Sequence, residues 1–365
     1  MLKINKPASL YIHVPFCEAK CFYCSFYSIK GTEQDFLTWL ENIKSQAQKL
    51  CARKIQLNTI YIGGGTPSIL SLKIWRGLLN FIHDYFDVST CLEFTVEANP
   101  NSLSRELLSL WKNFNVTRIS LGVQSLNNDE LKILGRLHDV NKALKAMELV
   151  KNFNFILSAD LIFAIPGQNI RTWHNSLTGV INSGVDHIST YQLTLEPDTK
   201  LAREKNLTNS DLNKSGYYFY RYTQYLLPKK NFLQYEISSF APENFECKHN
   251  LAYWTHKNII ALGESAAGYF EGTRYKISIE DPNKILLEKK LSRHDQAIEF
   301  AILNLRTKFG IDRHEFISRF DLETYNEIKN ILSNLPNELF CNTSDKIILS
   351  QKGMRLGNAI WSELI

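Results

Sequence analysis

The chain has 365 residues, enough for roughly two to three domains, or for one large domain with a smaller one beside it. Hydrophobic residues make up 44% and charged residues 22%, a balance typical of globular proteins that excludes disordered and collagen-like chains. The net charge of +5 is spread without a dense Lys/Arg block, so we expect no nucleic-acid partner.

No apolar run approaches the roughly 18 residues that span a bilayer. The longest, Phe155–Ile165, is broken by Asp160 and followed by Pro166. The first ten residues contain two lysines but neither an apolar signal core nor a cleavage site. We therefore predict a cytoplasmic protein whose contact with membranes, if any, is peripheral. The odd number of cysteines, seven, argues against a disulfide framework.

Up to about residue 195, short apolar runs alternate with amphipathic stretches. The predicted strands are Ser9–Val14, Thr59–Ile62, Leu92–Ala98, Arg118–Val123, Phe155–Phe163 and His187–Leu195. The predicted helices are Glu33–Cys51, Leu72–His83, Arg105–Phe114, Asp129–Leu134, Lys142–Phe153 and Arg171–Asn182. Such a series predicts an α/β fold with parallel strands, either an open sheet or a partial barrel, with chemistry at the carboxyl ends of the strands.

The alternation fades after about Glu196. The pattern predicts a polar helix at Ser210–Leu227, a strand at Leu233–Ile237 and a glycine-bearing turn at Leu262–Gly268. From residue 294 onward, helices, a hairpin around Asn342–Leu349 and a last helix resemble a winged-helix module. Without a basic patch we expect this module to pack against a neighbour rather than bind DNA. We place the domains at residues 1–235, 236–293 (a connecting or cover segment) and 294–365.

Three cysteines, Cys17, Cys21 and Cys24, lie on one loop directly after the first predicted strand. Their C-x3-C-x2-C spacing can direct three thiolates at one metal centre. A structural zinc ion would need a fourth ligand, for which His13 is the nearest candidate. In a [4Fe–4S] cluster held by three cysteines, one iron would have no protein ligand, and S-adenosylmethionine (SAM) could bind to that iron. The spacing favours the cluster.

Other polar and glycine residues lie at predicted strand ends. Gly63–Gly65 would let backbone amides approach a ligand, or would simply form a tight turn. Glu97 and Asp160 lie in apolar strands and need partners: either a ligand, or an internal salt bridge such as Asp160 with Arg118 or Arg136.

The cysteine loop resembles that of the radical-SAM superfamily. Its flanks, and the motifs that begin at Gly63, Glu97, Gly122, Asp160 and Glu196, look like the branch that contains oxygen-independent coproporphyrinogen III oxidase (a dehydrogenase) and the HemW-type haem chaperone. The resemblance covers nearly the whole chain and implies a partial (β/α)6 barrel with a C-terminal α+β winged-helix-like region.

The resemblance also implies ligands. It assigns Cys17, Cys21 and Cys24 to a [4Fe–4S] cluster. It assigns to SAM, or to a second SAM-like ligand, Tyr11, Tyr23, Gly64, Gly65, Thr66, Glu97, Gln124, Arg136 and Asp160. For the two tyrosines, ordinary packing is the competing interpretation.

Two features favour the chaperone over the dehydrogenase. The dehydrogenase has a further cysteine where this chain has Phe26, which argues against that activity without excluding it. The chaperone branch has an H-N-x-x-Y-W pattern, found here at His249–Trp254. His249 is thus a candidate haem ligand, or else a structural histidine. The resemblance implies haem as cargo, with haem-accepting proteins and an electron donor as partners. The rival of another class is a zinc-stapled binding protein that uses the winged tail.

One turn departs from the family pattern. The family usually has G-x-G-x-x-A-H-S, whereas this chain has Glu264 in place of a small residue and Ala267 in place of histidine. Any activity that depends on this turn is expected to be altered.

Overall fold

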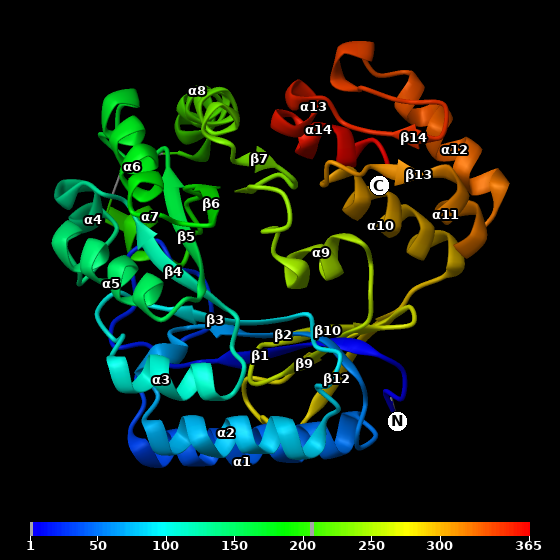
Figure 1. Ribbon diagram of the computed structural model, residues 1–365. Helices are drawn as coiled ribbons and strands as arrows, with labels where there is room; N and C mark the ends of the chain where they lie inside the picture. The colour runs from blue at the N-terminus through cyan, green and yellow to red at the C-terminus, as the bar shows by residue number, and fades with distance from the viewer. Residues whose placement is uncertain (1–2, 205–207) are drawn as a thin grey trace.

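Six parallel strands form the centre of the computed structural model, which describes residues 3–204 and 208–365 (Figure 1). They are β1 (Ala8–Val14), β2 (Leu57–Gly64), β3 (Glu93–Ala98), β4 (Arg118–Gln124), β5 (Ile156–Phe163) and β6 (His187–Gln192). Each pairs in parallel with the next along the chain. The sheet curves as a partial barrel, which confirms the predicted α/β class.

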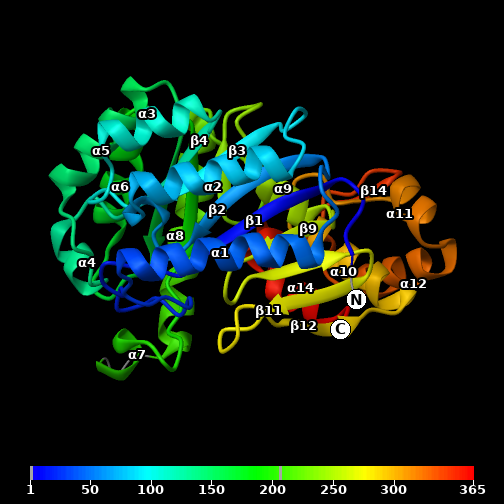
Figure 2. The same cartoon turned by 90° about the horizontal axis from the view of Figure 1, so that it is seen from below.

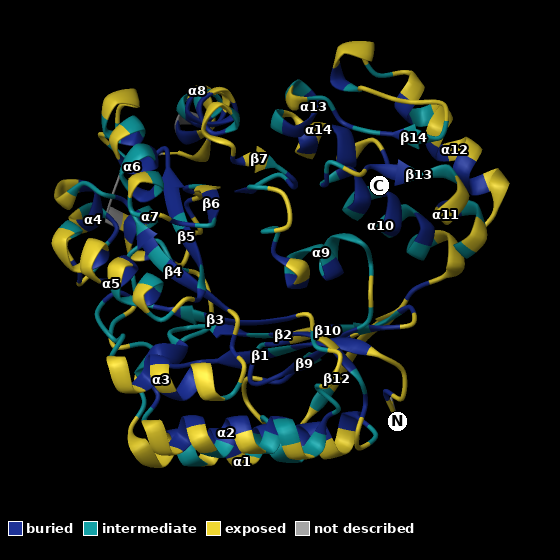
Figure 3. Ribbon diagram, in the orientation of Figure 1, coloured by how far each residue is buried: buried dark blue, intermediate teal, exposed yellow. Residues whose placement is uncertain are grey.

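Helices follow the first five strands and cover the convex face of the sheet (Figure 2). They are α1 (Glu33–Leu50), α2 (Leu72–Tyr85), α3 (Arg105–Asn113), α4 (Asn128–Ile133), α5 (Val140–Asn152) and α6 (Ile170–Asn182). A Ser, Thr, Asn or Asp side chain caps the start of each helix, where backbone N–H groups lack partners. Their apolar faces bury Trp39, Trp75, Trp111 and Trp173 against the strands, while the opposite faces are exposed (Figure 3).

Further strands extend the sheet at both edges, giving the order β12-β11-β10-β9-β1-β2-β3-β4-β5-β6-β8-β7. They are β7 (Leu233–Gln234), β8 (Ser239–Ala241), β9 (Ile259–Leu262), β10 (Ala267–Phe270), β11 (Thr273–Ile277) and β12 (Ile285–Lys290). Strand β9 pairs in parallel with β1. Residues 236–293, expected to form a connecting or cover segment, therefore contribute strands to the same sheet.

Three more helices connect these parts. They are α7 (Lys200–Glu204), α8 (Asn209–Leu226) and α9 (Lys248–Trp254). Helix α9 lies on the concave side of the sheet and contacts β2 and β3 (Figure 1). Short 3-10 helices cover Pro67–Ile69, Pro228–Lys230 and Asn337–Leu339.

The C-terminal region has a hydrophobic core of its own. Its elements are α10 (Arg293–Leu305), β13 (Ile311–Asp312), α11 (Arg313–Arg319), α12 (Leu322–Ser333), β14 (Lys346–Ile347), α13 (Gln351–Arg355) and α14 (Gly357–Ser362). This order matches the expected winged-helix-like arrangement. The guanidinium of Arg306 lies 4.5 Å from the Trp254 ring and 5.4 Å from the Trp361 ring, so it joins this region to α9. Among the described residues, no helix is long and apolar enough to cross a membrane.

Candidate cofactor-binding site

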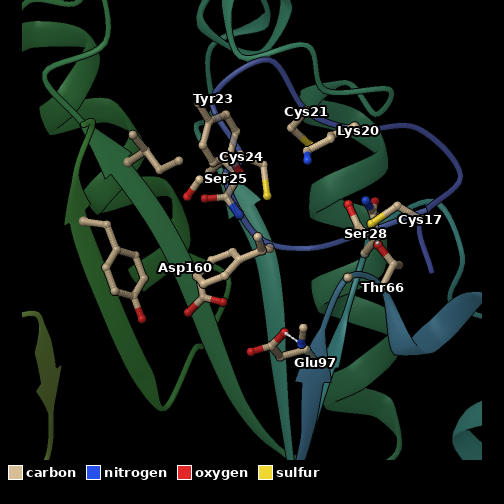
Figure 4. A pocket seen from close by; sticks show the side chains of 18 of the residues that line it. Cys17, Lys20, Cys21, Tyr23, Cys24, Ser25, Ser28, Thr66, Glu97 and Asp160 are labelled. Carbon is tan, nitrogen blue, oxygen red and sulfur yellow. Dashed lines mark hydrogen bonds between the residues drawn. The ribbon is translucent and has the colours of Figure 1, made fainter. Parts of the chain in front are cut away.

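The cysteine loop crosses the carboxyl ends of the strands (Figure 4). The backbone N–H of Cys17 donates to Ile29 O at 2.9 Å, and Ile29 N–H donates to Pro15 O at 2.7 Å, so the loop closes on itself. Phe22 N–H donates to Leu134 O at 3.0 Å and fixes the middle of the loop beside α4. All three cysteine side chains then line one cavity.

That cavity has a volume of about 470 Å³ and lies where the resemblance placed the ligands. Eleven of the twelve side chains or glycines assigned to the cluster or SAM line it: Cys17, Cys21, Tyr23, Cys24, Gly64, Gly65, Thr66, Glu97, Gln124, Arg136 and Asp160. Tyr11 does not. Its hydroxyl lies 3.0 Å from Nδ1 of His13, on the same strand. This agrees with the competing interpretation from the sequence, in which Tyr11 packs within the protein.

The glycine run is required by the protein's own packing. A Cβ at Gly63 would lie 2.7 Å from Glu97 Oε1, and one at Gly65 would lie 2.6 Å from the carbonyl oxygen of Phe16. Gly64 also has a φ of +111°, a conformation that L-residues rarely adopt. The run thus brings β2 against both the cysteine loop and Glu97, and its last two residues border the cavity.

Two carboxyl groups lie on the cavity floor, and the part of the chain that the structure describes provides neither with a cationic partner at hydrogen-bonding distance. Glu97 Oε1 accepts from the Tyr61 hydroxyl at 2.7 Å, and Oε2 accepts from Gly64 N–H at 2.9 Å. Burial, reinforced by the nearby Asp160 charge, raises the pKa of Glu97 to about 7 despite these hydrogen bonds. Burial also raises the pKa of Asp160 to about 6. Such a floor favours a cationic ligand, which would compensate the buried negative charge.

The salt bridges considered for Asp160 do not form. Asp160 accepts hydrogen bonds from Ser120 Oγ at 3.1 and 3.2 Å. Arg118 pairs instead with Glu93, at 3.0 Å. Arg136 donates to Cys21 Sγ at 3.2 Å and to Gly122 O at 2.8 Å, and so supplies positive charge beside a cysteine sulfur.

The three thiols that line the cavity fit the three protein-ligated irons of a [4Fe–4S] cluster. Within residues 3–204 and 208–365, no three His, Cys, Asp or Glu side chains are gathered closely enough to hold a single metal ion. His13, the candidate fourth zinc ligand, has its ring nitrogens 3.0 Å from the Tyr11 hydroxyl and 3.1 Å from Tyr27 O. A cluster binds one thiolate per iron corner, so it accepts thiols spread around a wider centre.

Several cavity residues were not singled out from the sequence. Tyr61, Tyr191 and Ser120 line the cavity beside the carboxyl groups. Tyr61 lies two residues before Gly63, and Ser120 lies two residues before Gly122, so the period-two alternation of a strand provided a signal for both side chains. Tyr191 has no motif residue at such a spacing.

His249 lies on α9, beneath the cavity floor and outside its lining. His249 is 1% exposed, and its imidazole packs against Tyr61 at a tilt, with ring centroids 5.1 Å apart. Thr59 donates its hydroxyl proton to Ser9, so the His249 Nδ1–H donates to Thr59 Oγ1 at 2.8 Å. Nε2 is left with a lone pair and no hydrogen-bond partner among the described residues. A nitrogen lone pair of this kind could coordinate haem iron, but in this conformation it is buried.

The turn that departs from the family pattern is strained and contains a buried carboxyl. Ser265 has a φ of +70°, in the left-handed region that favours glycine. Glu264 is 8% exposed, and its Oε2 has no hydrogen-bond partner among the described residues. Burial raises the pKa of Glu264. Glutamate at this position therefore lies in surroundings that disfavour its ionised form.

Glu264→Gln is expected to stabilise the protein by about 1 kcal/mol at pH 8, because a neutral amide is easier to bury than a carboxylate. The folded protein holds the Glu264 proton to a higher pH than the unfolded chain does. The gain should therefore shrink as the pH falls towards the ordinary range of a glutamate. Thermal unfolding at pH 8 and pH 5 measures this, with the exposed Glu280→Gln as a control. A gain that does not depend on pH would contradict the burial argument.

Comparison with known proteins shows the family to which the chain belongs. The Radical SAM superfamily model matches residues 11–178. Heme chaperone HemW of Lactococcus lactis subsp. lactis is 33% identical over 377 residues, which cover 99% of this chain and 98% of the relative. Heme chaperone HemW of Bacillus subtilis is 30% identical over 98% of this chain and 99% of the relative.

A solved structure shows the fold. Coproporphyrinogen III oxidase (HemN) from Escherichia coli, a radical SAM enzyme, superposes with a TM-score of 0.84 and covers 98% of this chain and 90% of that chain. Its sequence identity is only 19%, so this likeness concerns the fold alone. The two HemW relatives match this chain over nearly its whole length, and their sequences are more similar to it than that of HemN is. The chain therefore belongs to the HemW family of the radical SAM superfamily.

Proposed function

We propose that this protein binds haem and transfers it to acceptor proteins. The end-to-end similarity to relatives named heme chaperone carries the proposal. Phe26 supports it, since this side chain lies at the cavity where the dehydrogenase has a further cysteine. The proposal includes haem-accepting proteins and an electron donor as partners.

Membership of the radical SAM superfamily implies a [4Fe–4S] cluster and SAM. We propose that Cys17, Cys21 and Cys24 hold the cluster. Glu97, Gly64, Gly65 and Thr66 would then seat SAM, and Tyr23, Gln124, Arg136 and Asp160, which line the same cavity, would hold a second SAM-like ligand. A reduced cluster can supply an electron to SAM. The residues here would bind and orient the cofactors and limit the access of water.

The test of this function begins with anaerobic protein whose cluster has been reconstituted. Titration with haemin should produce a saturable Soret band, and haem should then pass to an added apo-haem protein faster than free haemin does. In parallel, the protein is incubated with SAM, a reductant and coproporphyrinogen III. Loss of two carboxyl groups from the porphyrin would identify a dehydrogenase and overturn the chaperone proposal.

The proposal that His249 ligates haem requires α9 to move, because Nε2 is buried beneath Tyr61. His249→Ala is then expected to shift the Soret maximum and to weaken haem binding about ten-fold or more. His174→Ala is the control, since that imidazole bonds Tyr222 on the outer helices. An unchanged Soret spectrum in His249→Ala would show that another residue holds the iron.

A further inference from the structure

The Tyr61 side chain contacts both Glu97, a carboxyl group of the cavity, and helix α9. Its hydroxyl donates to Glu97 Oε1 at 2.7 Å. Its ring lies against His249, with 5.1 Å between centroids and 31° between planes. Because it lines the cavity and His249 does not, the Tyr61 ring separates His249 from the ligand space.

A buried ion pair, Glu93 with Arg118, holds helix α9 against the sheet. Glu93 Oε1 accepts from His249 N–H at 3.1 Å and from the Cys247 thiol at 3.3 Å. Arg118 Nη2 donates to the carbonyl oxygens of Phe245 and Glu246, at 2.9 and 3.2 Å. The start of α9 is therefore fixed to β3 and β4, while its His249 ring supports Tyr61.

We infer that Tyr61 is a positioning residue that couples Glu97 to helix α9, so that SAM binding and the release of His249 oppose each other. This rests on the proposed seat of SAM at Glu97. With α9 closed, His249 supports the Tyr61 ring, and the phenol hydroxyl holds Glu97 in place. When α9 opens, Tyr61 loses that support, and Glu97 loses a hydrogen bond that favours its ionised form.

Because the coupling between two binding sites is reciprocal, the effect of each ligand on the other can be predicted. A ligand that prefers the closed arrangement stabilises α9, and anything that draws His249 out weakens the binding of that ligand by the same factor. SAM should therefore slow the opening of α9, whereas haem ligation through His249 should lower the affinity for SAM.

The test compares SAM binding and amide hydrogen exchange in cluster-loaded wild type and Tyr61→Phe. The variant keeps the ring and removes only the hydroxyl, so SAM should bind about ten-fold more weakly, the effect of one hydrogen bond to a charged group. In wild type, SAM should slow exchange in Lys248–Trp254. In Tyr61→Phe this effect should be lost.

A pH profile separates this role from simple loss of structure. The groups that face Glu97 are Tyr11, Tyr61, Asp160 and Tyr191. Removing the Tyr61 donor should move the pH at which SAM binding is half-maximal upward. A merely destabilised variant would keep the wild-type midpoint. Tyr85→Phe, which loses a phenol bond to Cys51 O outside the cavity, is the matched control.

Measuring Glu97→Gln in the same experiment separates the proposed SAM seat from the proposed role of Tyr61. If wild type does not bind SAM, or Glu97→Gln binds it unchanged, the proposed SAM seat fails. If Glu97→Gln weakens binding but Tyr61→Phe changes neither affinity nor exchange in α9, the inference about Tyr61 is wrong and the seat stands.

Discussion

Replacing Arg118 by leucine is expected to lower the free energy of unfolding by about 3–5 kcal/mol. Arg118 and Glu93 form a buried ion pair at 3.0 Å, with side chains 2% and 3% exposed. Burial alone would raise the pKa of Glu93, but the Arg118 charge and the hydrogen bonds from α9 outweigh it, so that pKa lies below the usual value. The variant leaves this carboxylate buried without its cation.

Urea unfolding of wild type and Arg118→Leu measures the effect, and Arg105→Leu, on the exposed face of α3, is the control. The deficit should be largest at alkaline pH and shrink as the pH falls, because without Arg118 burial raises the pKa of Glu93 in the folded variant, and protonation there removes the unpaired charge. A midpoint equal to that of Arg105→Leu would show that the pair contributes little.

Replacing Cys21 by alanine is expected to abolish the cluster, taking bound iron from ~4 atoms per chain to nearly none. Three protein thiolates are the minimum set for this type of site, and Cys21 also receives the Arg136 hydrogen bond. Iron and sulfide analysis after anaerobic reconstitution provides the measurement, together with the brown colour of the protein.

Cys341→Ala is the matched control, because Cys341 is exposed and lies in the C-terminal region. It should retain iron, sulfide and colour. Unchanged iron and sulfide in Cys21→Ala would refute the ligand assignment. Stoichiometric zinc and no iron in wild type would revive the zinc-stapled alternative.

The sequence predicted the central strands, and eleven of its twelve candidate cluster and SAM residues line the cavity, because their signals are local. Apolar runs such as Phe155–Phe163 mark strands buried on both faces, and the motifs fall at the ends of those strands. Among the strands that extend the sheet, β7 was predicted within Leu233–Ile237, whereas β8 to β12 were missed. β12 is mostly exposed and rich in lysine, and β9 is a run of only four residues whose last, Leu262, was the first residue of the predicted turn.

The partners of buried charges could not be predicted, because they depend on tertiary contacts. Arg118 was a candidate partner for Asp160, yet it pairs with Glu93 on the neighbouring strand. Tyr11 and His249 were recognised as motif residues, but only the fold shows that both lie outside the cavity lining. Alternation along β2 indicates the face of Tyr61, whereas its contact with α9 joins segments almost 190 residues apart.

The parallel pairing of β1 with β9 has a consequence for how the chain is made. β1 ends at Val14, but the strand that covers its outer edge begins at Ile259. At typical synthesis rates, on the order of 10–50 s separate the two during translation. Throughout that interval a nascent chain has an apolar strand with an open edge. Biosynthesis of this protein should therefore depend on ribosome-associated factors that shield such edges, and slowing translation before residue 259 should increase its aggregation.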